Sequence, residues 1–227
     1  MPTEWQAGPT SPPGSPRPSS AISQLWKQQL PTELEWITIF DHLSQLITLD
    51  HAFTPKEMEG ALTTGCWVEP TLVRLLAMRP LTRGNERCHV IEEVCRLGTL
   101  LFLAPIWRWF GASPVWTFNI SANLLSVLNA HMVEWDELKP LLTWAVYFAA
   151  IETRDTQERS QFVFILAVLM SGWQMREWDE LIKLIKGVLW ADVIFASSDD
   201  AIREDVLSIM QTPTGHMSPL TEIVDDA

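Results

Sequence analysis

The chain has 227 residues, of which 47% are hydrophobic and 19% are charged, so it is long enough to bury a substantial core. Its 28 Asp and Glu outnumber its 16 Lys and Arg, which gives a formal net charge of −12, and no two basic residues are adjacent. Nucleic-acid binding requires clustered positive charge that neutralises phosphates, so we expect no direct contact with nucleic acid.

The cysteines and apolar runs are typical of a protein that stays in a reducing compartment and outside the membrane. Cys66, Cys88 and Cys95 are too few and too widely spaced for a disulfide framework. The N-terminus has no apolar stretch of the kind found in signal peptides. The longest apolar runs, at 100–107 and 144–151, fall short of the roughly 20 residues that span a bilayer. We therefore expect a soluble intracellular protein with no membrane contact.

Both ends of the chain differ in composition from its middle. Residues 1–20 are rich in Pro, Ser and Gly, and such a segment buries too little apolar area to offset its ordering entropy, so we predict disorder. Residues 211–227 mix acidic and aliphatic side chains and are predicted to form a flexible acidic tail. The part between them, 21–210, is predicted to be one all-helical domain.

Proline positions and apolar spacing predict the first three helices. Residues 34–49 carry apolar side chains at helical spacing. Pro70 is typical of a first helical position and predicts a helix that extends through Met78. A longer helix follows from about residue 90, and Pro105 is predicted to kink it or end it near Ala104.

The second half of the chain continues the same three-or-four spacing of apolar residues. A helix from Ile120 to His131 follows a turn at 111–114, and no stretch shows the alternation typical of strands. The predicted fold is therefore all-α, a multi-helix array of antiparallel helical hairpins. The remaining predicted helices cover 137–152, 156–172, 180–195 and 199–210.

One short pattern occurs twice, at 132–138 and at 175–181, with Met, Glu, Trp, Asp, Glu and Leu in the same order. In each copy an aspartate, Asp136 or Asp179, is predicted to cap a helix, and the Glu after it lies in the first turn. The pair is interpreted either as an α-solenoid period or as two neighbouring helices that begin alike. We favour the second interpretation because there is no third copy.

The residue patterns that support catalysis or metal binding are lacking. Cys88 and Cys95 share a helix face with His89 between them, but Cys66 is remote and no close cysteine pair exists to begin a zinc site. The turn at 111–114 is not a nucleophile elbow, and no glycine-rich phosphate loop is present. We therefore expect no catalytic, cofactor or metal site and no enzymatic activity.

From Glu93 onward the chain carries a series of apolar and Trp positions in a defined order. The series consists of Glu93-Val94-Cys95-Arg96-Leu97-Gly98, Leu100-Leu101-Phe102-Leu103, Trp135, Leu141-Leu142-Thr143-Trp144, Glu152, Arg159, Phe162, Trp178 and Val188-Leu189-Trp190. Over roughly 93–192 it resembles the fungal-specific transcription factor domain, the regulatory half of fungal zinc binuclear-cluster transcription factors. The six-cysteine zinc cluster and basic linker of that family have no counterpart in this sequence, which agrees with the charge argument.

The resemblance implies a nuclear regulator of transcription that acts through protein contacts. Its expected partners are full-length transcription factors or a second copy of itself, and a small apolar effector is a further candidate ligand. The alternative functions are a free-standing cytoplasmic helical scaffold and a small-molecule-sensing protein.

Six residues are candidates for contacts between helices. Arg96 and Arg159 are expected to pair with Glu93 or Glu152. Tryptophan buries a large area and needs only one hydrogen-bond acceptor, so it suits helix contacts in a core. The tryptophans expected to anchor such contacts are Trp135, Trp144, Trp178 and Trp190.

Overall fold

The computed structural model describes residues 28–30, 35–49, 68–78, 87–109, 111–131, 133–195 and 200–211. The regular structure in these ranges is helical, which confirms the predicted all-α class. The predicted disordered segment 1–20 and all but the first residue of the predicted tail 211–227 lie outside the described residues. In chain order the elements are α2 (Glu35–Leu49), α4 (Val68–Ala77), α5 (Arg87–Trp109), α6 (Thr117–Ala130), the 3-10 helix η2 (Asp136–Leu138), α7 (Lys139–Glu152), α8 (Thr156–Gly172), α9 (Trp178–Lys186), α10 (Asp192–Phe195) and α11 (Asp200–Gln211).

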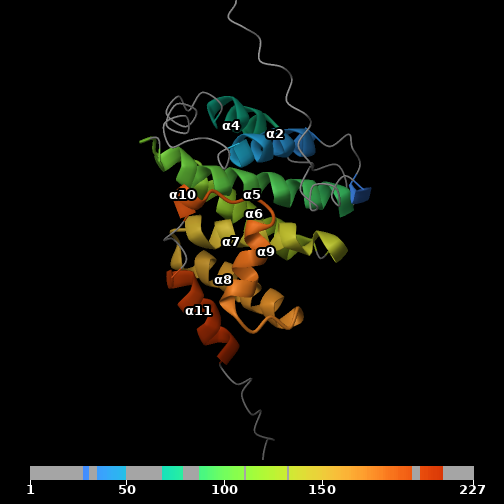
Figure 1. Cartoon of the computed structure of the whole chain (residues 1–227), viewed down its shortest axis with the longest axis vertical. Helices are drawn as coiled ribbons and strands as arrows, with labels where there is room; N and C mark the ends of the chain where they lie inside the picture. The colour runs from blue at the N-terminus through green and yellow to red at the C-terminus, as the bar shows by residue number, and fades with distance from the viewer. Residues whose placement is uncertain are drawn as a thin grey trace, which may run out of the picture.

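The helices form layers on either side of the long helix α5 (Figure 1). Helices α2 and α4 contact each other and lie together on one side of α5, whereas α7 packs against another side. Helix α8 packs on α7, and α11 packs on α8 at the end of the molecule farthest from α4. Helix α6 contacts α5, α7 and α8. The antiparallel sense of the predicted hairpins stays a prediction.

The contact between α5 and α7 forms the centre of the fold. Nearly every side chain of α5 between Val90 and Ile106 is buried, which is typical of a helix enclosed by other helices. Gly98 lies where the two backbones approach each other, because a Cβ atom built on it would be 2.5 Å from the Cβ of Ala145 and 2.9 Å from its Cα. Only glycine, which has no Cβ, allows α5 and α7 to meet at this distance.

Of the two outcomes predicted at Pro105, an end near Ala104 is wrong, because α5 continues through Pro105 to Trp109. A kink at the proline stays a prediction. A proline inside a helix removes one hydrogen bond and crowds the carbonyl of Leu101, four residues earlier. The side chain of Ile106, the next residue, is 1% exposed, so burial beyond the proline offsets part of that cost. Tertiary packing therefore carries the helix past a residue that ends most helices.

Helix α5 ends at Trp109, and Gly111 beyond it has a φ of 79° in the left-handed region that glycine adopts readily. The N–H of Gly111 donates to the carbonyl of Arg108 at 2.9 Å, and the N–H of Ala112 donates to the carbonyl of Trp107 at 3.2 Å. This pair of bonds is the Schellman arrangement, which satisfies carbonyls at the end of a helix.

The predicted helix 180–195 is also wrong, because the chain forms two helices there, α9 and α10, with 187–191 between them. Gly187 is the C-cap of α9, and its N–H donates to the carbonyl of Lys183 at 3.1 Å. Val188 and Leu189 are both 5% exposed, so the connection is buried although it is not helical.

Candidate functional site

A set of aromatic rings, which we call the aromatic cluster, fills the interior between α2, α5, α7 and the α9–α10 segment. Centroids of rings in contact lie from 4.8 Å apart, for Trp36 and Phe40, to 6.3 Å apart, for Tyr147 and Trp178. The rings meet in tilted or edge-on geometry, which is favourable for aromatic pairs. The cluster consists of Trp36, Phe40, Phe102, Trp144, Tyr147, Phe148, Trp178, Trp190 and Phe195.

Trp144 lies at the centre of the aromatic cluster and is 0% exposed. Its ring contacts Phe40, Phe102 and Phe148, which come from α2, α5 and α7. Its indole Nε1 donates a hydrogen bond of 2.9 Å to the carbonyl of Leu189. Trp144 therefore joins three helices and the buried connection between α9 and α10.

Trp178 and Trp190 lie at the edge of the same cluster. Trp178 is 3% exposed and contacts Tyr147, whereas Trp190 is only half-buried. The ammonium of Lys186 lies 5.2 Å from the centroid of the Trp190 ring, a distance at which a cation is attracted to the aromatic face. The Nε1 atom of Trp190 is buried and has no hydrogen-bond partner among the described residues.

Trp135 is buried outside the aromatic cluster, directly before η2. The predicted aspartate caps are wrong, because the cap positions of η2 and α9 are occupied by Trp135 and Glu177. Asp136 instead has a φ of 40°, and its carboxylate binds Arg87 at 3.0 Å. Asp179 lies inside the first turn of α9, so the repeated sequence pattern is used differently in its two copies.

The carboxylate of Glu92 is buried and accepts a hydrogen bond from the first turn of α2. The backbone N–H of Trp36 donates to Glu92 Oε1 at 3.2 Å, and the Trp36 indole donates to Thr99 Oγ1 at 2.9 Å. A negative charge suits this position because the first N–H groups of a helix have no partner within it. Burial raises the pKa of the Glu92 carboxyl, and the Trp36 N–H lowers it in part.

Arg96 connects α4 to α5 with all of its nitrogens in use. Its Nε and Nη2 donate to the two carboxylate oxygens of Glu93 at 2.7 and 2.6 Å, and its Nη1 donates to the carbonyl of Leu75 at 2.9 Å. Leu75 lies in the last turn of α4, where carbonyls lack a partner within the helix. The pair of Arg96 and Glu93 therefore closes the end of α4 against α5.

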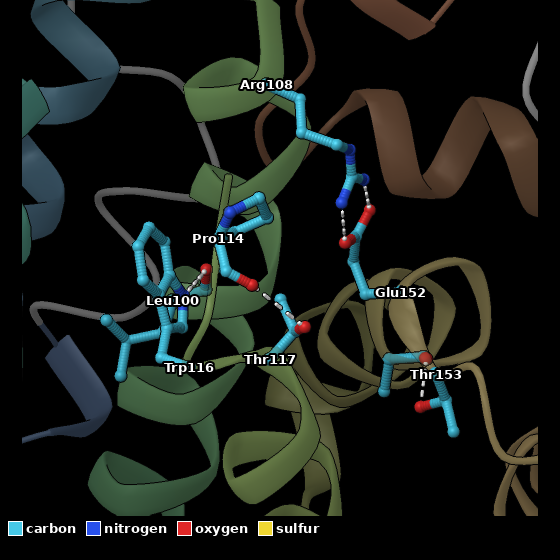
Figure 2. A network of polar contacts seen from close by, with 8 residues as sticks. Leu100, Arg108, Pro114, Trp116, Thr117, Glu152 and Thr153 are labelled. Carbon is cyan, nitrogen blue, oxygen red and sulfur yellow. Dashed lines mark hydrogen bonds and ion pairs between the residues drawn. The ribbon is translucent and has the colours of Figure 1, made fainter. Parts of the chain in front are cut away.

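A second ion pair joins the last turn of α5 to the last residue of α7. The guanidinium of Arg108 binds both carboxylate oxygens of Glu152, and Arg108 Nη1 donates to Glu152 Oε2 at 2.8 Å (Figure 2). The Glu152 side chain is 1% exposed and the Arg108 side chain is 41% exposed. Burial raises the pKa of the Glu152 carboxyl, and the hydrogen bonds and charge of Arg108 act against that rise.

The turn between α5 and α6 is fixed to α5 beside that ion pair. Figure 2 shows the Trp116 indole pointing back to the carbonyl of Leu100, to which it donates at 3.4 Å. The hydroxyl of Thr117 donates to the carbonyl of Pro114 at 3.3 Å. These two bonds hold the segment that leads into α6.

Arg159 binds Asp205 at 2.8 Å and joins α8 to α11, so its expected pairing with Glu93 or Glu152 is wrong. Glu93 is bound by Arg96 and Glu152 by Arg108. Sequence reasoning missed the role of Arg108, because its partner is 44 positions away. The available signal was an arginine at the end of the apolar second half of α5, where a cation is favoured.

Large apolar side chains that remain exposed form a second kind of feature, which the sequence analysis did not single out. Trp109, Val115 and Phe118 flank the turn from α5 to α6, and they are 56%, 85% and 64% exposed. On α8, Phe164 is 57% exposed and Val168 is 52% exposed. Such side chains are candidates for contact with other molecules.

Three further properties hold for the described residues. No group of three His, Cys, Asp or Glu side chains in them is arranged to hold a metal ion. Every helix in these ranges is too short or too polar to cross a bilayer. Cys95 is fully buried, and burial raises the pKa of its thiol well above its ordinary value.

No protein-family model, curated protein or solved structure matches this chain. The ionisable groups of Glu92, Arg96 and Glu152 are buried, and each binds another part of the fold. The partner of Glu152, Arg108, is partly exposed. Their chemistry is that of attachment between helices. The exposed apolar side chains are the groups that remain available for binding.

Proposed function

We propose that this chain is a regulatory domain that acts by binding other proteins, in the manner of the fungal-specific transcription factor domain that its sequence resembles. The observation that carries the proposal is the pair Phe164 and Val168 on α8. The two residues are four positions apart, so they are neighbours on one face of the helix, and both are more than half exposed. A partner helix with its own apolar stripe would fit such a face.

The interior of the domain supports a binding function. The rings of Trp144, Phe102 and Phe148 are 0% exposed and in mutual contact, so α8 is presented by a closely packed frame. Helix α8 rests on that frame through Phe162 and Leu166, which are both 0% exposed. A surface that is already in place binds without the loss of conformational entropy that ordering would add.

Affinity capture from nuclear extract of the source cells tests this function. The tagged full chain is compared with a double variant, Phe164→Ser with Val168→Ser, and captured proteins are identified by mass spectrometry. We expect the wild type to retain a transcription factor or co-regulator and the double variant to lose it. The matched control is Phe118→Ser, which removes an equally exposed phenylalanine from α6 and is expected to retain the partner.

Microscopy of the tagged chain provides the second readout. Accumulation in the nucleus together with the captured regulator supports the proposal. Exclusion from the nucleus, with no transcription protein among the captured partners, contradicts it and favours a cytoplasmic scaffold.

A further inference from the structure

Residues 109–133 contain no Asp, Glu, Lys or Arg, although charged residues make up 19% of the chain. This segment includes the whole of α6, Thr117–Ala130. Solvated helices in globular proteins carry charged side chains on their outer face. An outer face without charge is therefore unusual for this acidic protein.

The accessible side chains of α6 share one side of the helix. At roughly 100° per residue they cover a continuous sector, and the buried residues Ile120, Leu124 and Leu125 occupy the opposite side. The accessible side chains are small, amide or aromatic, and none is charged. We call this surface the α6 face; it consists of Phe118, Asn119, Ala122, Asn123, Ser126, Asn129 and Ala130.

Three large apolar side chains are exposed where the chain passes from α5 into α6. Trp109, Val115 and Phe118 expose 56%, 85% and 64% of their surfaces. Aromatic side chains bury roughly 150–250 Å² each, so the exposed parts of Trp109 and Phe118 offer roughly 200–300 Å² of apolar surface. That is about a third of the ~800 Å² that each partner buries in a standard protein interface, and Val115 with the remainder of the α6 face would supply the rest.

We infer that the α6 face, with Trp109 and Val115 beside it, is the surface through which two copies of this chain associate. This inference rests on the premise of the proposed function that the chain acts through protein contacts. In a two-fold dimer each patch meets its own counterpart, so a charged side chain near the axis would meet a like charge. A chain with a net charge of −12 can approach its own copy most closely through a face that carries no charge.

The polar groups of the α6 face are also suited to hydrogen bonds with the same groups of a second copy. Asn119, Asn123 and Asn129 carry amides, and Ser126 carries a hydroxyl. Amide and hydroxyl groups donate and accept hydrogen bonds, so each can pair with the same group of a second copy. A cationic partner, by contrast, would be drawn to the acidic parts of the surface. Charge and hydrogen-bonding chemistry therefore both favour a second copy as the occupant.

Sedimentation equilibrium of the purified full chain tests the inference over roughly 1–100 μM, where a micromolar dissociation constant is measurable. We expect the mass to rise from one copy to two across this range. High salt is expected to leave the association unchanged or to strengthen it, because salt screens the repulsion between two acidic chains. Phe118→Ser and Ser126→Glu, made separately, are each expected to raise the dissociation constant at least tenfold.

The control variants carry the same chemistry on α8. Phe164→Ser and Gln161→Glu also alter exposed positions, and they are expected to leave the dissociation constant unchanged. Circular dichroism of each variant checks that the helices are retained, and Ser126→Glu alters no buried side chain.

A single-copy mass throughout the range would overturn the inference. So would dissociation by the α8 variants and not by the α6 variants, or loss of the dimer in high salt. The measurement uses no partner protein, so a monomeric chain would leave the proposed function intact, and failure of partner capture would leave the dimer intact.

Discussion

The indole nitrogen of Trp144 and the carbonyl oxygen of Leu189 are 2.9 Å apart, and the hydrogen bond between them is buried. Leu189 lies in the segment that separates α9 from α10. Inside a continuous helix its carbonyl would accept from the N–H four residues further on. The interruption of the helix therefore leaves this carbonyl free to accept from a tryptophan of α7.

Replacement of Trp144 by phenylalanine should show how much that hydrogen bond contributes to the free energy of unfolding. The ring remains aromatic, but the buried carbonyl of Leu189 loses its donor, so we expect a loss of about 1–3 kcal/mol in the free energy of unfolding. Urea denaturation followed by circular dichroism measures the loss. The matched control is Trp190→Phe, because the Nε1 of Trp190 has no hydrogen-bond partner among the described residues. Equal losses in the two variants would contradict the role of the bond.

The crossing of α5 and α7 predicts that Gly98→Ala is destabilising. The added methyl group would lie 2.5 Å from the Cβ of Ala145, and overpacking of this kind costs about 1–3 kcal/mol. Ala145→Gly removes one of the two clashing atoms, so the double variant should be more stable than the sum of the single effects. The recovery should be partial, because the Ala145 Cα would remain at 2.9 Å. Thermal unfolding of the wild type, the two single variants and the double variant measures the coupling between the two positions. Strictly additive losses of stability would argue against this contact.

Two helix ends share one hydrogen-bond pattern but differ in the residue at its left-handed position. Gly111 ends α5 with a φ of 79°, and Gln174 follows α8 with a φ of 58°. Beyond α8, the N–H of Gln174 donates to Ser171 and the N–H of Met175 donates to Met170, as in a Schellman motif. A side chain in this backbone region costs about 1–2 kcal/mol, and glycine avoids that cost.

We therefore expect a glycine at position 174 and an alanine at position 111 to change the free energy of unfolding in opposite directions. Gln174→Gly should raise the free energy of unfolding by up to about 1 kcal/mol, after the entropy cost of glycine is subtracted. Gly111→Ala should lower it by about 1 kcal/mol. Chemical denaturation at one temperature compares both with the wild type. A destabilised Gln174→Gly variant would show that the side chain makes a contact worth more than the backbone strain.

The buried carboxyl of Glu92 should make stability depend on pH. Its pKa in the folded protein is raised above the ordinary value of 4.5, chiefly by burial, so the folded state holds this proton more tightly than the unfolded state. Its contribution to stability is therefore full below pH 4.5 and is lost as the pH rises through the raised pKa. Glu92→Gln removes the titration and keeps an oxygen that can accept from the Trp36 N–H.

Denaturation of both proteins at a series of pH values from roughly 4 to roughly 8 checks this sign. We expect the stability of Glu92→Gln relative to the wild type to increase as the pH rises. A relative stability that falls with pH would mean that the charged form of Glu92 is the better bound one. Glu69→Gln is the control, because Glu69 is an exposed carboxylate on α4 that does not contribute to the shift of the Glu92 pKa.

Sequence spacing could predict the ion pair within one helix but not the ion pairs between helices. Arg96 and Glu93 are three positions apart on one helix, so their pairing follows from helical geometry. Arg108 and Glu152 are 44 positions apart, and no local rule brings them together. Asp205 is likewise distant from Arg159, and the expected pairing of that arginine was wrong for the same reason.

The sequence by itself determined that the described chain is helical and where most helices lie, because apolar spacing and glycine or proline positions act over a few residues. The tertiary structure decided where the helices depart from these local sequence patterns. Helix α5 passes Pro105 because the residue beyond the proline is buried in the core. The helix predicted over 180–195 is interrupted after Lys186, and the Leu189 carbonyl in the buried connection accepts from Trp144 of α7. Burial and long-range hydrogen bonds act between segments that are remote in the chain, so no short window of sequence contains them.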